Sequence, residues 1–157
     1  MKISSQEEYG VRCLLQIGRR AQGASLTIPE ISRAEGLSNH YVAKLLRVLR
    51  RGGLVKSVRG QSGGYALARP LKEITVSEAL AVLGGRLYDP AFCGTHGGAE
   101  TVCAHTVECT IRHLWHSVQQ AVDHVLGKTT LEDLLPKDPL DGFPPSTPVQ
   151  LTEIRLS

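Results

Sequence analysis

Apolar residues in the first fifty positions recur with the period of amphipathic helices. Tyr9, Val11, Leu14, Leu15 and Ile17 predict a first helix over residues 4–20. Thr27 and Glu30 have capping-box spacing, which predicts a short helix that runs to about residue 35 and stops at Gly36. Ser38 is then expected to be the N-cap of a further helix over residues 39–51. The apolar stripe of that helix consists of Val42, Leu45, Leu46 and Leu49.

A basic row lies beside that stripe, because His40, Lys44, Arg47 and Arg51 follow a 4-3-4 spacing. A tight glycine turn between two helices, followed by a helix with a basic face, is typical of a helix-turn-helix. Residues 54–59 and 65–68 next predict two short strands, joined by the tip GQSGG, whose glycines permit positive φ. A hairpin directly after a recognition helix forms a wing. The pattern therefore favours a winged helix-turn-helix over a helical domain with a solvated basic face.

The second half predicts two helices. Thr75 or Ser77 begins a modest helix that ends at paired glycines. From Thr106, apolar residues recur with the 4-3-4-3-4 spacing of a heptad seam. The seam contains Val107, Ile111, Leu114, Val118, Ala121 and Val125, and a second row beside it contains Trp115, Val122 and Leu126. One row can pack on the chain's own core and the other on a partner, so we expect a homodimer. A single buried helix is the alternative.

These elements divide the chain into three parts. Residues 1–70 are expected to form a winged helix-turn-helix DNA-binding domain, and residues 71–135 a sensor loop and a dimerisation helix, closed by a short helix over 129–135. Residues 136–157 hold five prolines and few large apolar residues, and are expected to be a flexible tail. The predicted fold class is mainly α with a small β wing.

The net charge of +3 conceals an asymmetry between the two halves. Residues 1–69 contain 12 Lys/Arg and 4 Asp/Glu, a balance of +8, whereas residues 70–157 contain 6 and 11, a balance of −5. The basic half indicates a polyanionic partner such as double-stranded DNA. The sequence shows neither a signal peptide nor an apolar run long enough to span a bilayer, so we expect a cytoplasmic protein with no membrane partner.

The stretch FCGTHGGAETVCAHTVECTIRHLW concentrates three of the four cysteines: Cys93, Cys103 and Cys109. In a reducing compartment, clustered cysteines are more often metal ligands or catalytic groups than disulfides. Cys109 is expected in the first turn of the long helix, where the positive end of the dipole favours a thiolate, the form that binds iron–sulfur clusters and zinc. Three cysteines leave either site one ligand short, and His96 and His105 are nearby candidates.

Other groups with ligand chemistry have simpler interpretations. Cys13 lies among apolar residues and is expected to be a small buried side chain. Glu8 by itself indicates only a surface carboxylate, and His113, His116 and His124 indicate a solvated helix face. An enzyme with Cys109 as its nucleophile lacks an accompanying acid or oxyanion-stabilising element, so we do not expect catalysis.

The chain resembles the IscR/NsrR/RirA-type family of bacterial winged-helix regulators over about residues 1–135. The resemblance rests on MKISSQEEYGVRCLL, on SNHYVAKLLRVLRRGGLVKSVRGQSGGYALA, on the three-cysteine loop, and on CTIRHLW running to TTLEDLL. It implies a homodimeric transcriptional regulator that binds a near-palindromic DNA operator. It further implies that Cys93, Cys103 and Cys109 hold an iron–sulfur cluster, [2Fe–2S] or [4Fe–4S], whose state sets the affinity for DNA.

Two departures from the family pattern concern the cluster. The gap between Cys93 and Cys103 is longer than in IscR-like members, and Arg112 replaces the histidine that those members place three residues after the last cysteine. Some relatives take the fourth ligand from an acidic residue early in the first helix of the partner subunit, and Glu8 occupies that position. His105 and His113 remain alternatives. The same regulator using zinc or a cysteine thiol switch, without a cluster, is the alternative function.

Residues of the helix over 39–51 and of the wing are expected to contact DNA. Asn39, His40 and Tyr41 lie at the end of the recognition helix that reaches base edges, while Lys44, Arg47 and Arg59 are expected to neutralise phosphates. The remaining predicted DNA-binding positions are the cap and the wing tip, namely Ser38, Gly60, Ser62, Gly63 and Gly64.

Overall fold

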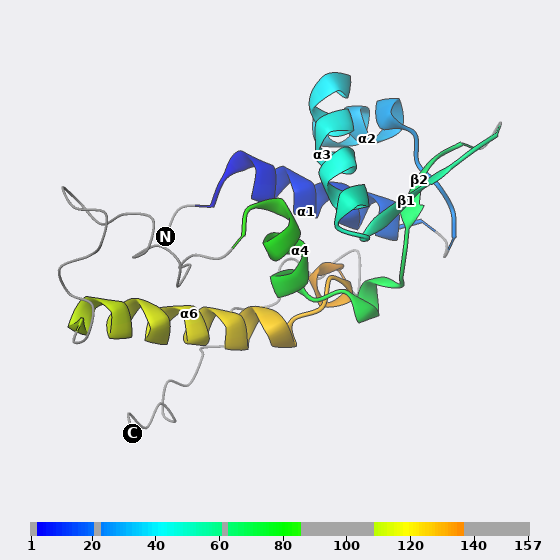
Figure 1. Cartoon of the computed structure of the whole chain (residues 1–157). Helices are drawn as coiled ribbons and strands as arrows, with labels where there is room; N and C mark the ends of the chain where they lie inside the picture. Colours follow the sequence, from blue (N-terminus) through cyan, green and yellow to red (C-terminus); the bar gives the residue numbers. More distant parts are fainter. Residues whose placement is uncertain (1–2, 21–22, 61–62, 86–108, 137–157) are drawn as a thin grey trace.

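The computed structural model describes residues 3–20, 23–60, 63–85 and 109–136. In chain order its elements are α1 (Ser5–Gly18), α2 (Ile28–Glu35), α3 (Asn39–Arg51), β1 (Val55–Val58), β2 (Gly64–Leu67), the 3-10 turn η1 (Leu71–Glu73), α4 (Val76–Leu83), α6 (Thr110–Lys128) and the 3-10 turn η2 (Glu132–Leu134). The described residues are mostly helical with one small antiparallel sheet, as the sequence predicted (Figure 1).

Side-chain caps set the starts of the first four helices. Ser4 and Thr27 each form a complete capping box, with Glu7 and Glu30 respectively. Ser38 and Thr75 each accept a hydrogen bond from the backbone three residues ahead. Each cap satisfies amide groups that have no partner within the helix, so these starts are encoded locally. The predicted boundaries of α2 and α3 therefore agree closely with the structure.

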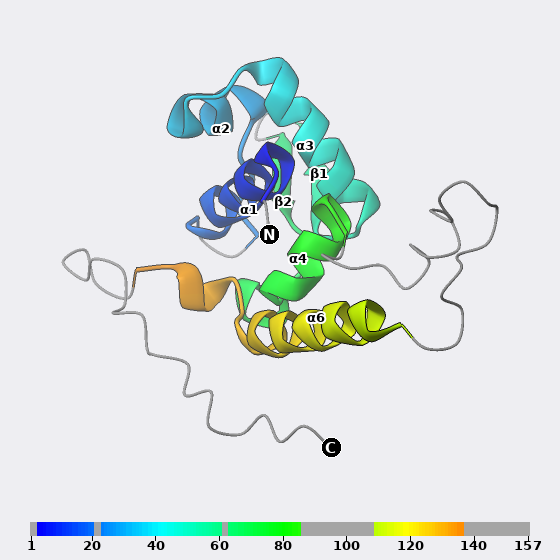
Figure 2. The same cartoon turned by 90° about the vertical axis from the view of Figure 1, so that its left-hand side faces the viewer.

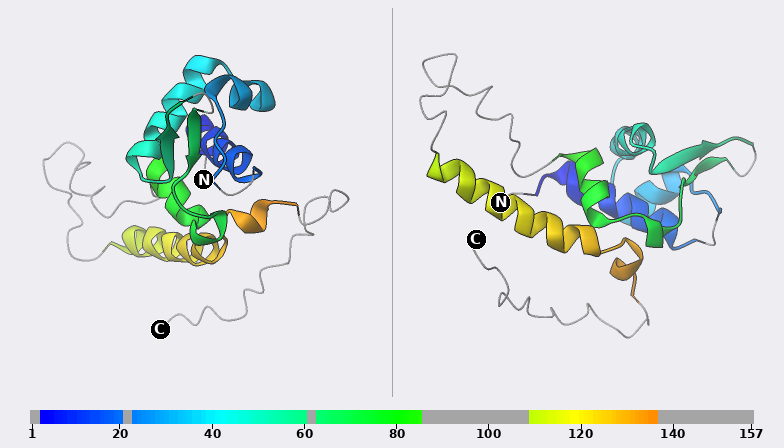
Figure 3. Two further views of the ribbon diagram at one scale, coloured as in Figure 1. Left: turned by 90° about the vertical axis from the view of Figure 1, so that its right-hand side faces the viewer. Right: turned by 60° about the horizontal axis from the view of Figure 1, so that its bottom comes forward.

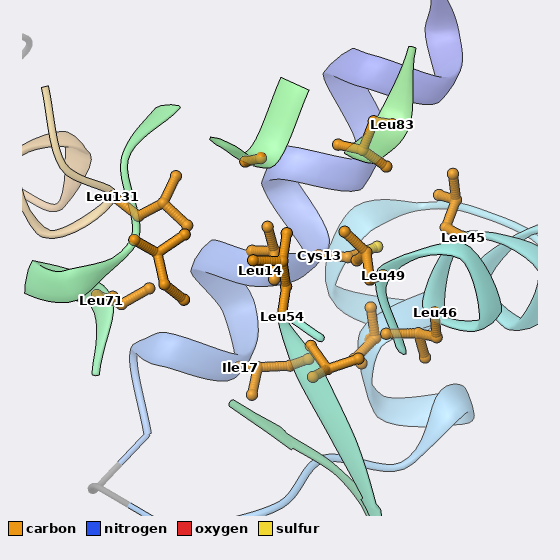
Figure 4. Close-up of a cluster of buried hydrophobic side chains, with 14 of the residues drawn as sticks. Cys13, Leu14, Ile17, Leu45, Leu46, Leu49, Leu54, Leu71, Leu83 and Leu131 are labelled. Atoms are coloured by element: carbon orange, nitrogen blue, oxygen red, sulfur yellow. The ribbon is translucent and has the colours of Figure 1, made fainter. Parts of the chain in front are cut away.

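Helix α1 lies at the centre of the described fold. It contacts α2 and α3 on one side and α4 on another, and α4 in turn contacts α6 (Figure 2). The core contains leucines, isoleucines and valines from α1, α2, α3, β1 and α4, together with Cys13 and Leu131 (Figure 4). The predicted stripe on α3 is completely buried, since Val42, Leu45, Leu46 and Leu49 are each 0% exposed.

The wing is a hairpin in which Val55 pairs with Leu67 and Val58 with Gly64. Leu26 extends the pairing by bridging to Tyr65 through two backbone hydrogen bonds of 2.9 and 2.8 Å. Gly64 makes this close approach possible, because it has a φ of +154° and a Cβ there would lie 2.4 Å from the carbonyl oxygen of Leu26. The base of the wing is thus fixed to the segment that leads into α2.

The segment after α6 returns to the core. The amide of Val76 donates to the carbonyl oxygen of Thr129 at 2.8 Å, and the side chain of Leu131 is completely buried. The C-terminal end of α6 is therefore anchored beside α4. The N-terminal half of α6 extends past the ends of the other helices (Figures 1 and 3). The predicted flexible tail lies outside the described residues, apart from Pro136.

Candidate nucleic-acid interface and sensor helix

The exposed face of α3 has the character that DNA binding requires. His40, Lys44, Arg47 and Arg51 are exposed opposite the buried stripe, and Asn39 is exposed at the first position of the helix. Within the described residues, Lys44, Arg47 and Arg59 form no ion pair. Their charges are therefore available to neutralise phosphates.

Two predicted contacts at the start of α3 also have structural partners. The Ser38 hydroxyl accepts a hydrogen bond from the amide of Tyr41 at 3.2 Å. The Tyr41 ring is half-buried and meets the Tyr9 ring of α1 edge to face, with 6.2 Å between centroids and an interplanar angle of 83°. Asn39 and His40 are thus the exposed members of the predicted base-reading group.

At the wing, Arg59 and Gly60 are exposed directly after β1. Gly60 has a φ of +105°, and its carbonyl oxygen accepts a hydrogen bond from the amide of Gly63 at 2.9 Å. Gly63 and Gly64 are half-buried, and Ser62 lies outside the described residues. The described part of the wing therefore places the Arg59 guanidinium next to a turn whose positive φ at Gly60 favours glycine.

Cys109 occupies the N-cap of α6, not its first turn as the sequence suggested. Its backbone is extended, with φ −118° and ψ 98°, and its sulfur accepts a hydrogen bond from the amide of Arg112 at 3.4 Å. The helical residues begin at Thr110 because the thiol itself caps the free amides. Cys93 and Cys103, with His96 and His105, lie outside the described residues.

Helix α6 packs one face against the core and exposes apolar side chains on another. Leu126 packs against the core, and Gln119 is 6% exposed. A neighbouring face exposes the large apolar side chains Ile111, Leu114, Trp115 and Val125, which are 58%, 53%, 46% and 44% exposed. Most of the predicted seam is therefore exposed. Trp115 keeps its place in the second row, and it is exposed because the N-terminal half of α6 extends past the other helices (Figure 1). Val107 lies outside the described residues.

Glu8 lines an open groove of about 980 Å³ between the start of α1, α4 and α6. The part of α6 in this groove is its C-terminal half, including Gln119 and Asp123. The Glu8 carboxylate is 49% exposed and accepts hydrogen bonds from Arg12. This hydrogen bond and the opposite charge of Glu8 raise the pKa of Arg12 above its ordinary value.

The burial of the remaining ligand-type residues agrees with their simple interpretations. His113, His116 and His124 are exposed, and no group of three His, Cys, Asp or Glu side chains in the described residues could hold a metal ion. Cys13 is completely buried, and this burial, with a smaller contribution from the charge of Glu35, raises its thiol pKa to about 12. It is an inert core side chain.

A small network around Arg12 was not predicted from the sequence. Its Nη1 lies 4.0 Å from Oε2 of Glu35, and its Cζ lies 5.7 Å from the centroid of the Tyr9 ring. The four-residue spacing of Glu8 and Arg12 predicts a helical ion pair, so that contact was detectable. The contact with Glu35 depends on how α2 packs on α1 and has no local signal.

The comparisons with known proteins give the family. The model of the Rrf2 family, described as iron-dependent transcriptional regulators, matches residues 3–137. The chain belongs to the Rrf2 family. It is 33% identical to the HTH-type transcriptional regulator CymR of Bacillus subtilis over 134 residues, covering 85% of this chain and 89% of CymR. It is 32% identical to IscR of Photobacterium profundum over 135 residues, covering 86% of this chain and 76% of IscR.

Solved structures of the Rrf2 family share the fold. The structure of CymR, the global cysteine regulator of B. subtilis, matches with a TM-score of 0.67 and 33% identity, over 85% of this chain and 95% of that chain. IscR from T. potens matches with a TM-score of 0.67 and 30% identity, over 85% of each chain. The protein is therefore a DNA-binding transcriptional regulator and not an enzyme, as predicted. Within the described residues, no helix is long and apolar enough to cross a membrane.

Proposed function

We propose that the protein is a homodimeric regulator whose affinity for a near-palindromic DNA operator is set by an iron–sulfur cluster. Cys93, Cys103 and Cys109 are the cysteine ligands, and the partner subunit's Glu8 is the fourth ligand. The cluster, [2Fe–2S] or [4Fe–4S], supplies a redox- and iron-sensitive link between subunits. Because the protein acts on bacterial-type operators, the proposal places it in the cytoplasm.

The described donors fit such a group. Cys109 lies at a helix N-terminus, where its sulfur accepts a hydrogen bond from the backbone amide of Arg112. Glu8 presents a half-exposed carboxylate that can exchange its surface partner for a metal. Thiolates with one oxygen donor form a donor set that iron accepts.

The observation that carries the proposal is the separation of these two donors within one chain. Glu8 faces the part of α6 that begins at Gln119, whereas Cys109 caps the other end. At 1.5 Å rise per residue, ten residues of helix span about 15 Å. One cluster cannot bridge that distance, so Glu8 and Cys109 meet at one cluster only when they come from different subunits.

The bare apolar face of α6 supports a dimer. Ile111, Leu114, Trp115 and Val125 are large side chains on an extended helix, and such a face favours association with a partner. Antiparallel or crossed packing of two α6 helices brings the N-terminal half of each towards the other subunit. Since the end of α6 is anchored to the core, its pairing also fixes the spacing of the two recognition helices.

Anaerobic purification tests the cluster directly. The wild-type protein is expected to be brown, with a broad visible absorption band and near-stoichiometric iron and sulfide. Cys93→Ala and Cys109→Ser should lose the band. Serine is a good N-cap, so Cys109→Ser retains the start of α6 while removing the sulfur. Cys13→Ala is the matched control, because it removes a cysteine that is buried in the core.

Glu8→Ala tests the fourth ligand. The variant is expected to assemble a cluster with a shorter lifetime in air and a shifted spectrum. An unchanged spectrum and lifetime would remove Glu8 from the site while leaving the three cysteines in place. Mixing Glu8→Ala and Cys109→Ser chains should restore one intact site per heterodimer, because the ligands come from different subunits.

The relation to CymR supports a second candidate, in which zinc or a cysteine thiol switch replaces the cluster. One solved relative is titled the oxidized form of Staphylococcus aureus CymR. A colourless protein that contains zinc, or that changes its DNA affinity on reversible thiol oxidation without iron, would favour this candidate. DNA binding itself is common to both.

A further inference from the structure

Arg12 contacts two carboxylates that lie on different helices. Its Nε and Nη2 lie 2.8 and 2.7 Å from Oε1 of Glu8, four residues earlier on α1. Its Nη1 lies 4.0 Å from Oε2 of Glu35, in the last turn of α2. In this arrangement the hydrogen bonds of the guanidinium go to Glu8, and Glu35 receives only a longer-range charge interaction.

Glu35 is the more buried of the two carboxylates and gains more from a neighbouring positive charge. Its side chain is 8% exposed, whereas that of Glu8 is 49% exposed. Gln16 donates a hydrogen bond to Oε1 of Glu35 at 2.5 Å, which leaves the other oxygen facing Arg12. Because a buried carboxylate gains most from a directly hydrogen-bonded cation, a closer approach of Arg12 would strengthen its interaction with Glu35.

The position of Arg12 also affects the recognition helix. Its guanidinium lies over the Tyr9 ring, and the edge-to-face contact of Tyr9 with Tyr41 continues to the first turn of α3. Tyr41 follows Asn39 and His40 and donates its amide to the N-cap Ser38. A movement of Arg12 therefore changes the packing under the part of α3 that faces DNA.

We propose that Arg12 is a positioning residue that divides its guanidinium between Glu8 and Glu35, and that this division sets the position of the start of α3. When Glu8 becomes a ligand, Arg12 loses its first partner and closes on Glu35. Tyr9 and Tyr41 then shift with it. The inference depends on the proposed function only for the event that withdraws Glu8; the coupling itself is a property of this chain without a cluster.

The test uses full-length protein in a cluster-free Cys93→Ala background. Glu8→Gln removes the charge that holds Arg12 and so reproduces the withdrawal of Glu8 without any metal. The four tyrosines of the chain are replaced by 3-fluorotyrosine, and Tyr41→Phe assigns the fluorine resonance of Tyr41. Glu8→Gln is expected to shift this resonance, whereas Glu73→Gln, at an exposed carboxylate outside the network, is expected to leave it in place.

Arg12→Gln provides the decisive background. In that background Glu8→Gln should shift the Tyr41 resonance no further. In a chain that keeps Arg12, Glu35→Gln should abolish the shift caused by Glu8→Gln. DNA affinity, measured on an operator selected from genomic fragments, should change about 5-fold or more with Glu8→Gln when Arg12 is present, the low end of common allosteric couplings. It should be unchanged by Glu8→Gln when Arg12 is absent.

Two results would overturn the inference: an unmoved Tyr41 resonance in Glu8→Gln, or an equal response with and without Arg12. Neither depends on a cluster. A wild-type protein without iron but with the Arg12-dependent shift would refute the proposed cofactor and leave this coupling intact. A cluster-containing protein without the Arg12-dependent shift would support the proposed cofactor and refute this coupling.

Discussion

The backbone amide of Leu131 donates a hydrogen bond to the carbonyl oxygen of Ile74, with an N···O distance of 2.9 Å. It joins the segment after α6 to the segment before α4, and the Leu131 side chain completes the core at that place. Helix α6 and the DNA-binding elements therefore share one core.

Leu131→Ala is expected to lower the free energy of unfolding by about 2–4 kcal/mol, the usual cost of removing a fully buried leucine. Urea unfolding followed by circular dichroism measures this change. Leu134→Ala is the control, because Leu134 is 41% exposed and its loss should cost less than about 1 kcal/mol. Equal effects of the two substitutions would contradict the role assigned to Leu131.

Gly64→Ala is expected to destabilise the wing, since the new Cβ would lie 2.4 Å from a backbone oxygen of Leu26 and the φ of +154° disfavours a side chain. We expect a loss of about 1–3 kcal/mol and weaker DNA binding. Gly127→Ala in α6 has open space and should leave stability equal or raise it by up to about 1 kcal/mol. Thermal unfolding of both variants checks the contrast.

The protonation of Glu30 makes the stability of the protein vary with pH in the acid range. Hydrogen bonds from the backbone and side chain of Thr27 lower the pKa of Glu30 below its ordinary value of 4.5. The ionised carboxylate therefore stabilises the folded state above that value, and this contribution is lost as the pH falls through the lower, folded pKa. Glu30→Gln should melt below the wild type at pH 7, and the difference should vanish in strong acid. A constant difference across pH would contradict this origin.

Cys13 is expected to resist thiol reagents in the folded protein. Its pKa of about 12 leaves almost no thiolate at pH 8, and its side chain is completely buried. A chain carrying Cys93→Ser, Cys103→Ser and Cys109→Ser should bind no Ellman's reagent until urea is added, and then bind one equivalent. Rapid labelling without urea would show that α1 opens locally.

Arg47→Ala is expected to weaken DNA binding and to reduce the slope of log affinity against log salt by about 1, because one phosphate contact is lost. Arg33→Ala is the matched control, since Arg33 is exposed on α2 and was not assigned to the interface. Fluorescence anisotropy over a range of salt concentrations gives both slopes. An unchanged slope in Arg47→Ala would remove this residue from the phosphate contacts.

Much of the site was predictable because its determinants are close together in the sequence. The caps at Thr27 and Ser38, the apolar stripe of α3 and its basic face follow from helical period and side-chain hydrogen bonds. The start of α6 was placed too early because the spacing of apolar residues continues through Cys109, whereas the thiol cap ends the helix there. The exposure of Trp115, which shares a row with the core-packed Leu126, depends on how far α6 extends past the core (Figure 1), and the pattern did not determine this.

By itself, the sequence determined the helix-turn-helix, the wing and the apolar seam of the long helix, since each depends on neighbours within a few residues. Only the tertiary structure decided that Arg12 reaches Glu35, that Gly64 lies against Leu26, that Leu131 closes the core, and that Glu8 faces the end of α6 away from Cys109. These contacts join segments far apart in the chain, and they form only when the burial of a common core brings those segments together.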